Sequence, residues 1–398
     1  MRRLFSHPIF KNQTFIAFIY ILAAAIACLV KVSLDFKPHD AATYISKVNN
    51  FIIFKNSFYH LINHTTLYGP HPVEQYDLYK YSPTFALLFA PFALFPTYIG
   101  AVLWAVFNAF VLFWAIAKLP IDAGKKTFIY WFALIELLTS IQNSQVNPLI
   151  AALFLFTFIA FERKQLLLAA LLVILSAYIK VYGILGAALF VLYPDKIKFM
   201  LYCIGWTILL FLLPMLVISY DELLNQYEGW QDTIANDHQT RAVDVSIMRF
   251  VMAVSGMEFS NKMRLLIQIV GVVIFCLKYT RTRLFALMEF RLLVLASVMI
   301  WSIVFNHLAE SATYIIAIVG IALWYTTEQK HPLTIALLIA CFILSSLSPT
   351  DIFPRSIREL YIVPYALKAL PCFLVWAYIE YRLLTGGVSA YHKTPHAD

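Results

Sequence analysis

Two aspartates, Asp35 and Asp40, lie five residues apart in the stretch SLDFKPHDAATY, directly after an apolar run long enough to form a membrane helix. A carboxylate held in a fixed place can act as a general base, taking the proton from a hydroxyl group as its oxygen attacks a reacting carbon. The simpler interpretation is that an aspartate at the end of a membrane helix is solvated or caps the next helix. The other polar residues of the chain decide between the two interpretations.

Further polar side chains interrupt or flank the apolar runs. The cations among them suit a phosphate group, and the amides and hydroxyls suit the hydroxyls of a sugar. Each has an ordinary alternative, because amides form turns, a lysine can extend to the membrane interface, and a histidine can bond a glutamate three residues on. These residues are Tyr81, Asn143, Gln145, Asn147, Lys180, His238, Arg241, His307, Glu310 and Arg355.

The elements that must position these residues are membrane helices. The chain is 61% hydrophobic and 13% charged, with a mean hydropathy of +0.76. Soluble domains are about 45–50% apolar and about 25% charged. Apolar runs recur along the whole length, and the sequence therefore predicts an all-α polytopic membrane protein. We expect one membrane-embedded domain over residues 1–398, with about twelve transmembrane helices. Several of these are shorter than a full span of roughly 17–25 residues, notably 127–141, 147–161 and a pair within 165–193 that a turn near Lys180 separates.

The positive charge of the chain, +8 overall, concentrates in short loops, among them the basic stretch from Lys278 to Arg283. The positive-inside rule explains this pattern better than nucleic-acid binding does. Arg2, Arg3 and Lys11 place the amino terminus in the cytoplasm, and the alternation of loops places the carboxyl terminus there too. The long segments 33–82 and 220–262 then lie on the outer face of a membrane, which the composition suggests is a bacterial inner membrane.

All the polar residues named above fall on this outer face. The outer segment 33–82 also alternates apolar clusters, such as FIIF and FYHLI, with polar residues, which predicts amphipathic helices on the membrane surface. Ionisable residues at membrane depth cost about 2.5–3.5 kcal/mol each on insertion scales. Their convergence on one face favours a wet functional cavity there over a set of unrelated structural roles.

Short motifs along the chain follow an order that is similar to that of a known family. They are Asp35-Phe36 with Ala41-Ala42, Tyr81-Ser82-Pro83, Ser144-Gln145-Val146-Asn147, Lys180, and the run from Asn306 to Tyr314 with Glu310. Together they resemble the polyprenol-phosphate-mannose-dependent mannosyltransferases of glycosyltransferase family 87. The chain departs from that family at Gly183, where a proline is common, and at His238-Gln239-Thr240, where NQS is common.

The resemblance implies a GT-C fold, a helical membrane bundle whose active site faces outward under a first loop bearing amphipathic helices. It implies inverting transfer of a hexose, typically mannose, from a polyprenyl-phosphate donor to an acceptor hydroxyl. It also implies that an aspartate of the first loop is the general base. Asp35 matches the family's DF aspartate, and Asp40 is the reserve or a supporting residue. One carboxylate suffices, because a lipid phosphate is already a good leaving group.

We expect the remaining residues to divide between the donor phosphate and the two sugars. Donor phosphate binding falls to the cations Lys180, Arg241, His307 and Arg355. Sugar and acceptor binding falls to Tyr81, Asn143, Gln145, Asn147, His238 and Glu310. The expected partners are the polyprenyl-phosphate sugar donor, a glycolipid or glycan acceptor and the lipid bilayer, with no nucleic acid. The sequence says nothing of the oligomeric state.

Two alternatives stay open from the residues alone. One is a multi-spanning transporter or lipid flippase, and the other is a ligase or polymerase that transfers a whole glycan from a lipid carrier. The five cysteines all lie within apolar runs and have no metal-ligand spacing. No tight set of Asp and His ligands stands out either, so we expect no cofactor and no divalent metal.

Overall fold

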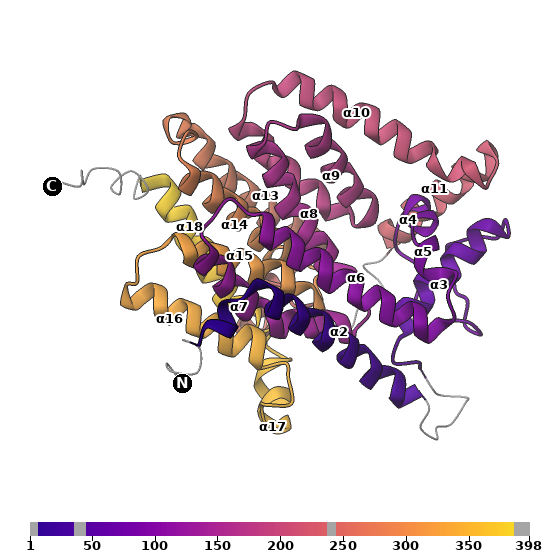
Figure 1. Cartoon of the computed structure of the whole chain (residues 1–398), viewed down its shortest axis with the longest axis horizontal. Helices are drawn as coiled ribbons and strands as arrows, with labels where there is room; N and C mark the ends of the chain where they lie inside the picture. The colour runs from indigo at the N-terminus through magenta and orange to yellow at the C-terminus, as the bar shows by residue number, and fades with distance from the viewer. Residues whose placement is uncertain (1–6, 36–44, 237–243, 386–398) are drawn as a thin grey trace. The chain divides into compact units, whose positions relative to one another are not determined.

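The computed structural model describes residues 7–35, 45–236 and 244–385 of the chain. These residues form helices joined by turns, and no strand occurs in the three ranges (Figure 1). The predicted all-α class is therefore confirmed. Three predicted site residues, Asp40, His238 and Arg241, lie outside the described ranges.

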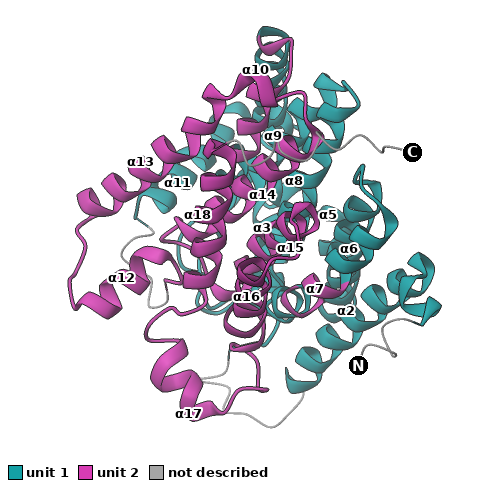
Figure 2. Ribbon diagram, turned by 90° about the vertical axis from the view of Figure 1, so that its left-hand side faces the viewer, with its two compact units in different colours: residues 1–130, 137–184, 197–241 teal, residues 131–136, 185–196, 242–398 magenta. Residues whose placement is uncertain are grey.

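The chain divides into two compact units, drawn in teal and magenta in Figure 2. Unit 1 comprises residues 1–130, 137–184 and 197–241, and unit 2 comprises residues 131–136, 185–196 and 242–398. Each unit is built from segments that are separated in the sequence, so neither is a continuous stretch of chain. A single domain over residues 1–398 stays a prediction.

Unit 1 is organised around long apolar helices that pack through small side chains. Ala24 and Ala27 lie on the buried stripe of α2, which packs beside α6, where Ala105 and Ala109 are buried. Small side chains let helix backbones approach closely in a membrane, where packing rather than exclusion of water holds helices together. The helices of this unit are α2 (Gln13–Asp35), α3 (Asn49–Ile62), α4 (Pro83–Leu88), α5 (Ala90–Ala93), α6 (Thr97–Lys118), most of α7 (Ala123–Gln142), α8 (Asn147–Glu162), α9 (Leu166–Ile179), α10 (Lys196–Leu212) and α11 (Tyr220–Asn236).

Unit 2 has a core made by two helices that pack along each other, α14 and α15. The segment Ile315–Trp324 of α15 is buried at every position, as is typical of a helix that is apolar all round. The helices of this unit are α12 (Ile247–Ser255), α13 (Asn261–Leu277), α14 (Met288–Val304), α15 (Ile315–Thr327), α16 (Pro332–Ala340), α17 (Arg355–Ile357) and α18 (Ala369–Thr385). The 3-10 helix η2 (Val181–Leu192) begins in unit 1 and ends in unit 2.

Among the described residues, four helical segments are long and apolar enough to cross a membrane: Gln13–Asp35, Thr97–Lys118, Lys196–Leu216 and Asn261–Thr280. Five shorter apolar helices accompany them: Asn147–Glu162, Leu166–Ile179, Val181–Leu192, Ser311–Thr327 and Pro332–Leu347. In the third and fourth long segments only 17% of the most apolar window is buried by protein, which suits side chains that face lipid. A membrane-embedded helical protein is supported, and the number of about twelve crossings stays a prediction.

The outer segment 33–82 contains one amphipathic helix in its described part. Both apolar clusters of the sequence, FIIF and FYHLI, fall within α3, whose buried residues include Phe51, Phe54 and Phe58. Residues 63–82 then continue as turns and extended chain. The segment 220–262 carries two helices, α11 and α12, in the part that the structure describes.

Two ion pairs are buried inside unit 2. Lys278 Nζ donates to Glu380 Oε1 (2.6 Å) and lies 3.6 Å from the centre of the Phe275 ring, and Lys368 Nζ donates to Glu136 Oε1 (2.7 Å). The sequence pattern placed Lys278 in a basic loop exposed to the cytoplasm. Its side chain is instead fully buried, so it contributes a structural ion pair rather than a loop charge.

Candidate active site

Four of the predicted site residues, all in unit 1, form one cluster around a buried amide. Asn147 is fully buried, and its Oδ1 accepts hydrogen bonds from Lys180 Nζ (2.9 Å) and from the Tyr182 hydroxyl (3.4 Å). The Lys180 ammonium lies 5.8 Å from the centre of the Tyr81 ring and 5.7 Å from that of Tyr182. The Tyr81 hydroxyl in turn donates to Gln145 Oε1 (3.5 Å). Aromatic faces and an amide oxygen thus hold one ammonium group in place.

The backbone on either side of Asn147 explains why it lies there. Asn147 is the first residue of α8 and is followed by Pro148, a residue that suits the first turn of a helix. The turn before it contains Ser144 in the left-handed region, with φ 51°. The Ser144 carbonyl accepts from the Trp104 indole (3.1 Å) of α6. The turn is therefore fixed by the neighbouring helix.

Lys180 lies at the point where α9 stops being helical. Its backbone is extended, with φ −139° and ψ 123°, and its N–H still donates to the Ser176 carbonyl (2.8 Å). The chain continues as a 3-10 helix from Val181. The break predicted near Lys180 in the apolar stretch 165–193 is therefore confirmed, and it turns the lysine side chain toward Asn147.

Tyr81 is positioned by a set of hydroxyl groups. The Tyr68 hydroxyl donates to the Tyr81 carbonyl (2.7 Å), and the Tyr79 hydroxyl donates to the Ser82 carbonyl (2.8 Å). The Ser82 hydroxyl donates to the Tyr178 carbonyl (2.6 Å) near the end of α9. Burial raises the pKa of Tyr68 and Tyr79 well above the ordinary value, so both hydroxyls remain neutral donors. The Tyr-Ser-Pro motif is thereby tied to the helix that presents Lys180.

Asp35 is the last residue of α2 and is buried, with 8% of its surface exposed. Its Oδ1 accepts from the Lys47 backbone N–H (2.7 Å) and its Oδ2 accepts from the Ser46 hydroxyl (2.5 Å). These bonds fix the orientation of the carboxylate, as a general base requires.

Residues at the start of α3 form hydrogen bonds both to Asp35 and to the turn that precedes Asn147. Lys47, whose N–H donates to Asp35, lies two residues before the first residue of α3, Asn49. The Asn50 side chain in the first turn of α3 donates to the Asn143 carbonyl (2.8 Å). Asn143 is the C-cap of α7, and its side-chain amide donates to the Thr139 carbonyl (2.8 Å) in the last turn of that helix. Asp35 and the turn that precedes Asn147 are thus both bonded by residues at the start of α3, within unit 1.

Three predicted site residues belong to unit 2, and each has a separate partner there. His307 Nδ1 lies 3.4 Å from Gln268 Nε2, which also donates to the Phe305 carbonyl (2.9 Å). Glu310 forms a capping box with Thr313 at the start of η7 (Ser311–Tyr314). Arg355 is exposed and pairs with Glu359, one helical turn away, at 2.6 Å.

Sequence reasoning missed Tyr182 and the buried network of Lys368. Tyr182 sits two residues after Lys180, and a lone tyrosine in an apolar run of a membrane protein is too common to mark a site. Lys368 Nζ, besides its bond to Glu136, donates to the hydroxyl of Ser311 (3.1 Å), the residue after Glu310. The available signal was that Glu136 and Lys368 are single charges inside apolar runs, which are rare and usually paired.

The arrangement in unit 1 offers the groups that a transfer reaction on a phosphate ester needs. An oriented carboxylate can accept a proton, a held ammonium can neutralise phosphate charge, and amide and phenol groups can bond sugar hydroxyls. Comparison with protein-family models matches residues 79–305 to glycosyltransferase family 87. This range includes Tyr81, Gln145, Asn147 and Lys180. Comparison with curated proteins gives no match.

Proposed function

Because the chain belongs to glycosyltransferase family 87, we propose that it transfers a hexose, mannose in the first instance, from a polyprenyl-phosphate donor to an acceptor hydroxyl. The acceptor is a glycolipid or a glycan, and the reaction takes place on the outer face of the cell membrane. One observation carries this proposal: unit 1 presents a doubly hydrogen-bonded aspartate and an ammonium group held by a buried amide, and residues at the start of α3 bond both that aspartate and the turn that leads to the amide.

In the proposed reaction the acceptor oxygen attacks C1 of the donor sugar, and Asp35 takes the proton of that hydroxyl. The bond between C1 and the phosphate oxygen breaks as the new glycosidic bond forms, so a single displacement inverts the configuration at C1. Polyprenyl phosphate leaves with the electron pair of the broken bond. A phosphate is a stable anion, so the reaction needs charge stabilisation more than a general acid.

Lys180 is the cation that we propose to stabilise the leaving phosphate. A compact ammonium held by an amide oxygen and two aromatic faces has a fixed position, from which it can neutralise the charge of a phosphate group beside it. Tyr81, Gln145 and Asn147 then contact the sugar around it. Asn143, His307, Glu310 and Arg355 keep their expected roles in sugar or phosphate binding as predictions, as do Asp40, His238 and Arg241.

A lipid-linked donor needs apolar space as well as polar groups. Unit 2 contains, by itself, a cavity of about 400 Å³ whose lining is almost wholly apolar and includes Ile247, Val251, Ile267, Phe305 and Trp376. Gln268, whose side chain lies beside His307, is the next residue in the chain after Ile267, which lines the cavity. Such a cavity supports a prenyl chain as part of the substrate, because isoprene units are recognised through apolar burial.

Membership in a glycosyltransferase family leaves the transporter or flippase alternative without support. A ligase or polymerase that moves a whole glycan shares the family-level chemistry, and the released lipid distinguishes it. Transfer of one hexose from a lipid monophosphate releases polyprenyl phosphate, whereas transfer from a lipid pyrophosphate releases polyprenyl pyrophosphate.

The test is a transfer assay with purified protein, polyprenyl-phosphate mannose and a glycolipid acceptor, in which released polyprenyl phosphate is measured. Asp35→Asn keeps an oxygen that accepts from the Lys47 N–H but removes the base. We expect its rate to fall by about 10²–10⁴-fold, the usual contribution of a general base. Asp40→Asn serves as the comparison.

Two outcomes would change the proposal. Full activity of Asp35→Asn together with loss in Asp40→Asn would move the base to Asp40. Full activity of both variants, or release of no polyprenyl phosphate by the unaltered protein from any hexose donor, would overturn it. Retained folding of each variant is checked by size-exclusion chromatography and circular dichroism.

A further inference from the structure

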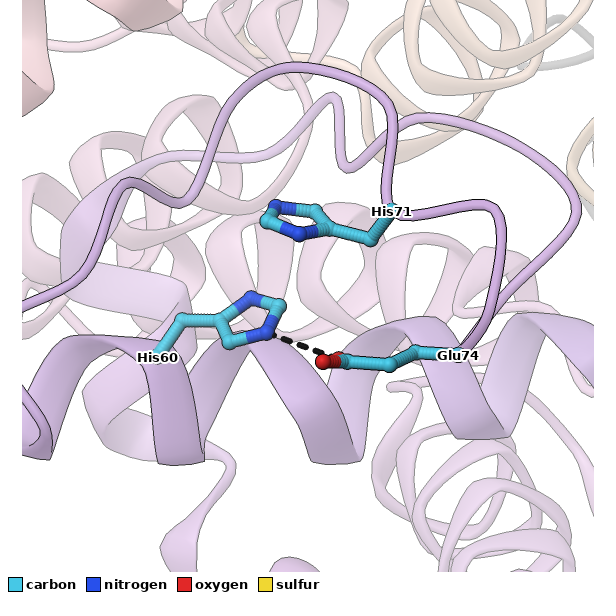
Figure 3. Close-up of side chains that lie close together, drawn as sticks. All are labelled: His60, His71 and Glu74. Atoms are coloured by element: carbon cyan, nitrogen blue, oxygen red, sulfur yellow. Dashed lines mark hydrogen bonds and ion pairs between the residues drawn. The ribbon is translucent and has the colours of Figure 1, made fainter.

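Three side chains of types that can bind a metal ion, all in unit 1, lie close together where the chain leaves α3 (Figure 3). His60 lies in the last turn of α3, and His71 and Glu74 lie in the segment that follows. His60 Nε2 lies 2.8 Å from Glu74 Oε2, and the His60 and His71 rings face each other with centroids 4.1 Å apart and planes tilted by 33°. One ligand atom from each of the three residues lies within 4.8 Å of the other two.

The His71 Nε2 atom is buried and has no hydrogen-bond partner among the described residues. A buried imidazole nitrogen without a partner loses its hydration without compensation, so an unfilled one marks a position where a ligand is expected. The cluster therefore contains one His–carboxylate contact and, beside it, a second imidazole whose buried nitrogen remains to be satisfied.

The surrounding backbone holds the three residues in place. The Glu74 and Gln75 N–H groups both donate to the His71 carbonyl (2.9 and 3.0 Å), which closes a tight turn that carries two of the ligands. The same segment runs along one face of α3, where Tyr76 N–H donates to Asn49 Oδ1 (3.0 Å). Because Asn49 and His60 are eleven residues apart, about three helical turns, they share a helix face.

We propose that His60, His71 and Glu74 bind a divalent transition-metal ion, with Zn²⁺ as the best match, in place of the expectation from the sequence that no divalent metal is bound. Two imidazoles and a carboxylate are a common ligand set for Zn²⁺, whereas Mg²⁺ and Ca²⁺ prefer oxygen ligands only. Ligand atoms on one tetrahedral ion with bonds of about 2.0–2.1 Å lie about 3.4 Å apart. Side-chain shifts of about 1 Å, mainly a rotation of the His71 ring, close the site, and water completes the coordination.

The consequence of binding is structural. The metal joins the end of α3 to the segment 71–76, which leads directly to Tyr79 and Tyr81. It therefore fixes the connection between α3, which begins two residues after Lys47, and Tyr81, whose ring lies beside the Lys180 ammonium. The ion takes no part in the transfer step, so the site and the proposed function succeed or fail independently.

The experiment uses the full chain, purified in detergent with a tag that contains no histidine, stripped with a chelator and then titrated with Zn²⁺. We expect one ion per chain by elemental analysis, a rise in the thermal unfolding midpoint with Zn²⁺, and no comparable effect of Mg²⁺ or Ca²⁺. Substitution with Co²⁺ should give the visible absorption of a site with nitrogen ligands.

Two variants and a matched control make the result decisive. His71→Ala and Glu74→Gln should each weaken Zn²⁺ binding by at least about 100-fold. The control is His64→Ala, because His64 also pairs with a glutamate, Glu222, at 3.1 Å in unit 1 but belongs to no group of three ligands in the described ranges.

His64→Ala should bind Zn²⁺ as the unaltered chain does. The proposal is overturned if the unaltered chain, equilibrated with free Zn²⁺, contains no bound ion by elemental analysis. It is equally overturned if His71→Ala binds as tightly as the control, or if the control loses binding to the same extent. In each of these cases the cluster is a histidine–carboxylate pair only.

Discussion

Lys180 shows how a single charge in an apolar run acquires a specific partner. The sequence indicates a lysine at the membrane edge, and a snorkelling side chain would explain it equally well. The structure gives its ammonium a buried amide oxygen at 2.9 Å and two phenol rings. A lysine that only reached for the interface would not need a fully buried partner, because water would satisfy it.

Substitution of Lys180 should therefore reduce activity much more than stability. A hydrogen bond to a charged group contributes about 1.5–3 kcal/mol, so we expect Lys180→Met to lower kcat/KM for the lipid donor by about 10- to 100-fold. Lys180→Arg should recover part of this loss, because it keeps the charge. Lys55→Met is the matched control, since Lys55 also donates to an oxygen in unit 1, the Phe95 carbonyl (2.8 Å), away from the cluster. Equal losses in Lys180→Met and Lys55→Met would contradict a binding role.

The buried pair of Lys368 and Glu136 permits a prediction about stability. Removing one partner leaves the other as an unpaired buried charge, which typically destabilises a protein by about 3–5 kcal/mol. Lys368→Met should therefore lower the thermal unfolding midpoint strongly, as should Glu136→Gln to a lesser extent, because a neutral amide can still accept from the ammonium. The double variant should be more stable than Lys368→Met alone. A double variant as unstable as the sum of the two single variants would contradict the pairing.

These charges also mark the limit of prediction from sequence at the residue scale. Short motifs predict Asp35, Tyr81, Gln145, Asn147 and Lys180 as site residues, because their types and order carry chemical meaning, and the structure brings the last four together. Lys278 was assigned to a loop by its basic neighbours, and only the fold reveals Glu380 as its partner, more than a hundred residues further along the chain. Pairing of that kind depends on tertiary packing, which no local pattern encodes.

At the scale of elements, Gly183 explains a departure from the family pattern. A Cβ at this position would lie 2.3 Å from the Ser176 hydroxyl oxygen and 2.5 Å from the Ser176 carbonyl oxygen. The Gly183 N–H also donates to the Lys180 carbonyl (2.7 Å). A proline has no backbone N–H and could not form this hydrogen bond. Glycine therefore permits the close turn that follows Lys180 in this chain.

Gly183→Ala should disturb the turn and, with it, the position of Lys180. The contact is with backbone as well as side chain, so the turn itself must move, and we expect a fall in activity of about tenfold or more together with a lower unfolding midpoint. Gly124→Ala is the control, because a Cβ there meets nothing within 4 Å at the start of α7. It should leave activity unchanged and stability the same or slightly higher. Full activity of Gly183→Ala would show that Lys180 does not depend on this turn.

Element boundaries were predictable where the sequence provides clear start and stop signals. The predicted crossing 147–161 corresponds to α8, which begins at Asn147-Pro148. The predicted crossing 127–141 is longer in the structure, because α7 already begins at Ala123 with two lysines in its first turns. A hydropathy pattern assigns charged residues to loops, whereas a helix end can carry them into the interface region.

At the scale of the whole molecule, composition and periodicity were enough to predict an all-helical membrane protein. The division into two units was not predictable, because each unit draws on distant segments, such as residues 131–136 and 185–196 in unit 2. A hydropathy pattern reports which residues meet lipid or protein, but it does not report which helices share a core. The sides of the membrane on which the loops lie therefore need a direct measurement.

Labelling of introduced cysteines tests the predicted orientation. The positive-inside rule places the loop with Asp122 and the loop with Lys330 in the cytoplasm, and it places Val73 and Asp221 outside. All four positions are exposed in the structure, so a cysteine at each can react without disturbing the core. The background is a chain whose five natural cysteines, Cys28, Cys203, Cys276, Cys341 and Cys372, are replaced by alanine or serine.

A membrane-impermeant maleimide added to intact cells should label Val73→Cys and Asp221→Cys at once. It should label Asp122→Cys and Lys330→Cys only after the membrane is permeabilised. Val73 lies in the same predicted outer segment, 33–82, as Asp35 and Tyr81. If Val73 faces outward, Asp35 and the cluster of Lys180 and Tyr81 lie on the outer face, where we propose that they meet the lipid-linked sugar. Labelling of Asp122→Cys in intact cells, with Val73→Cys protected, would reverse the orientation and place the proposed transfer reaction in the cytoplasm.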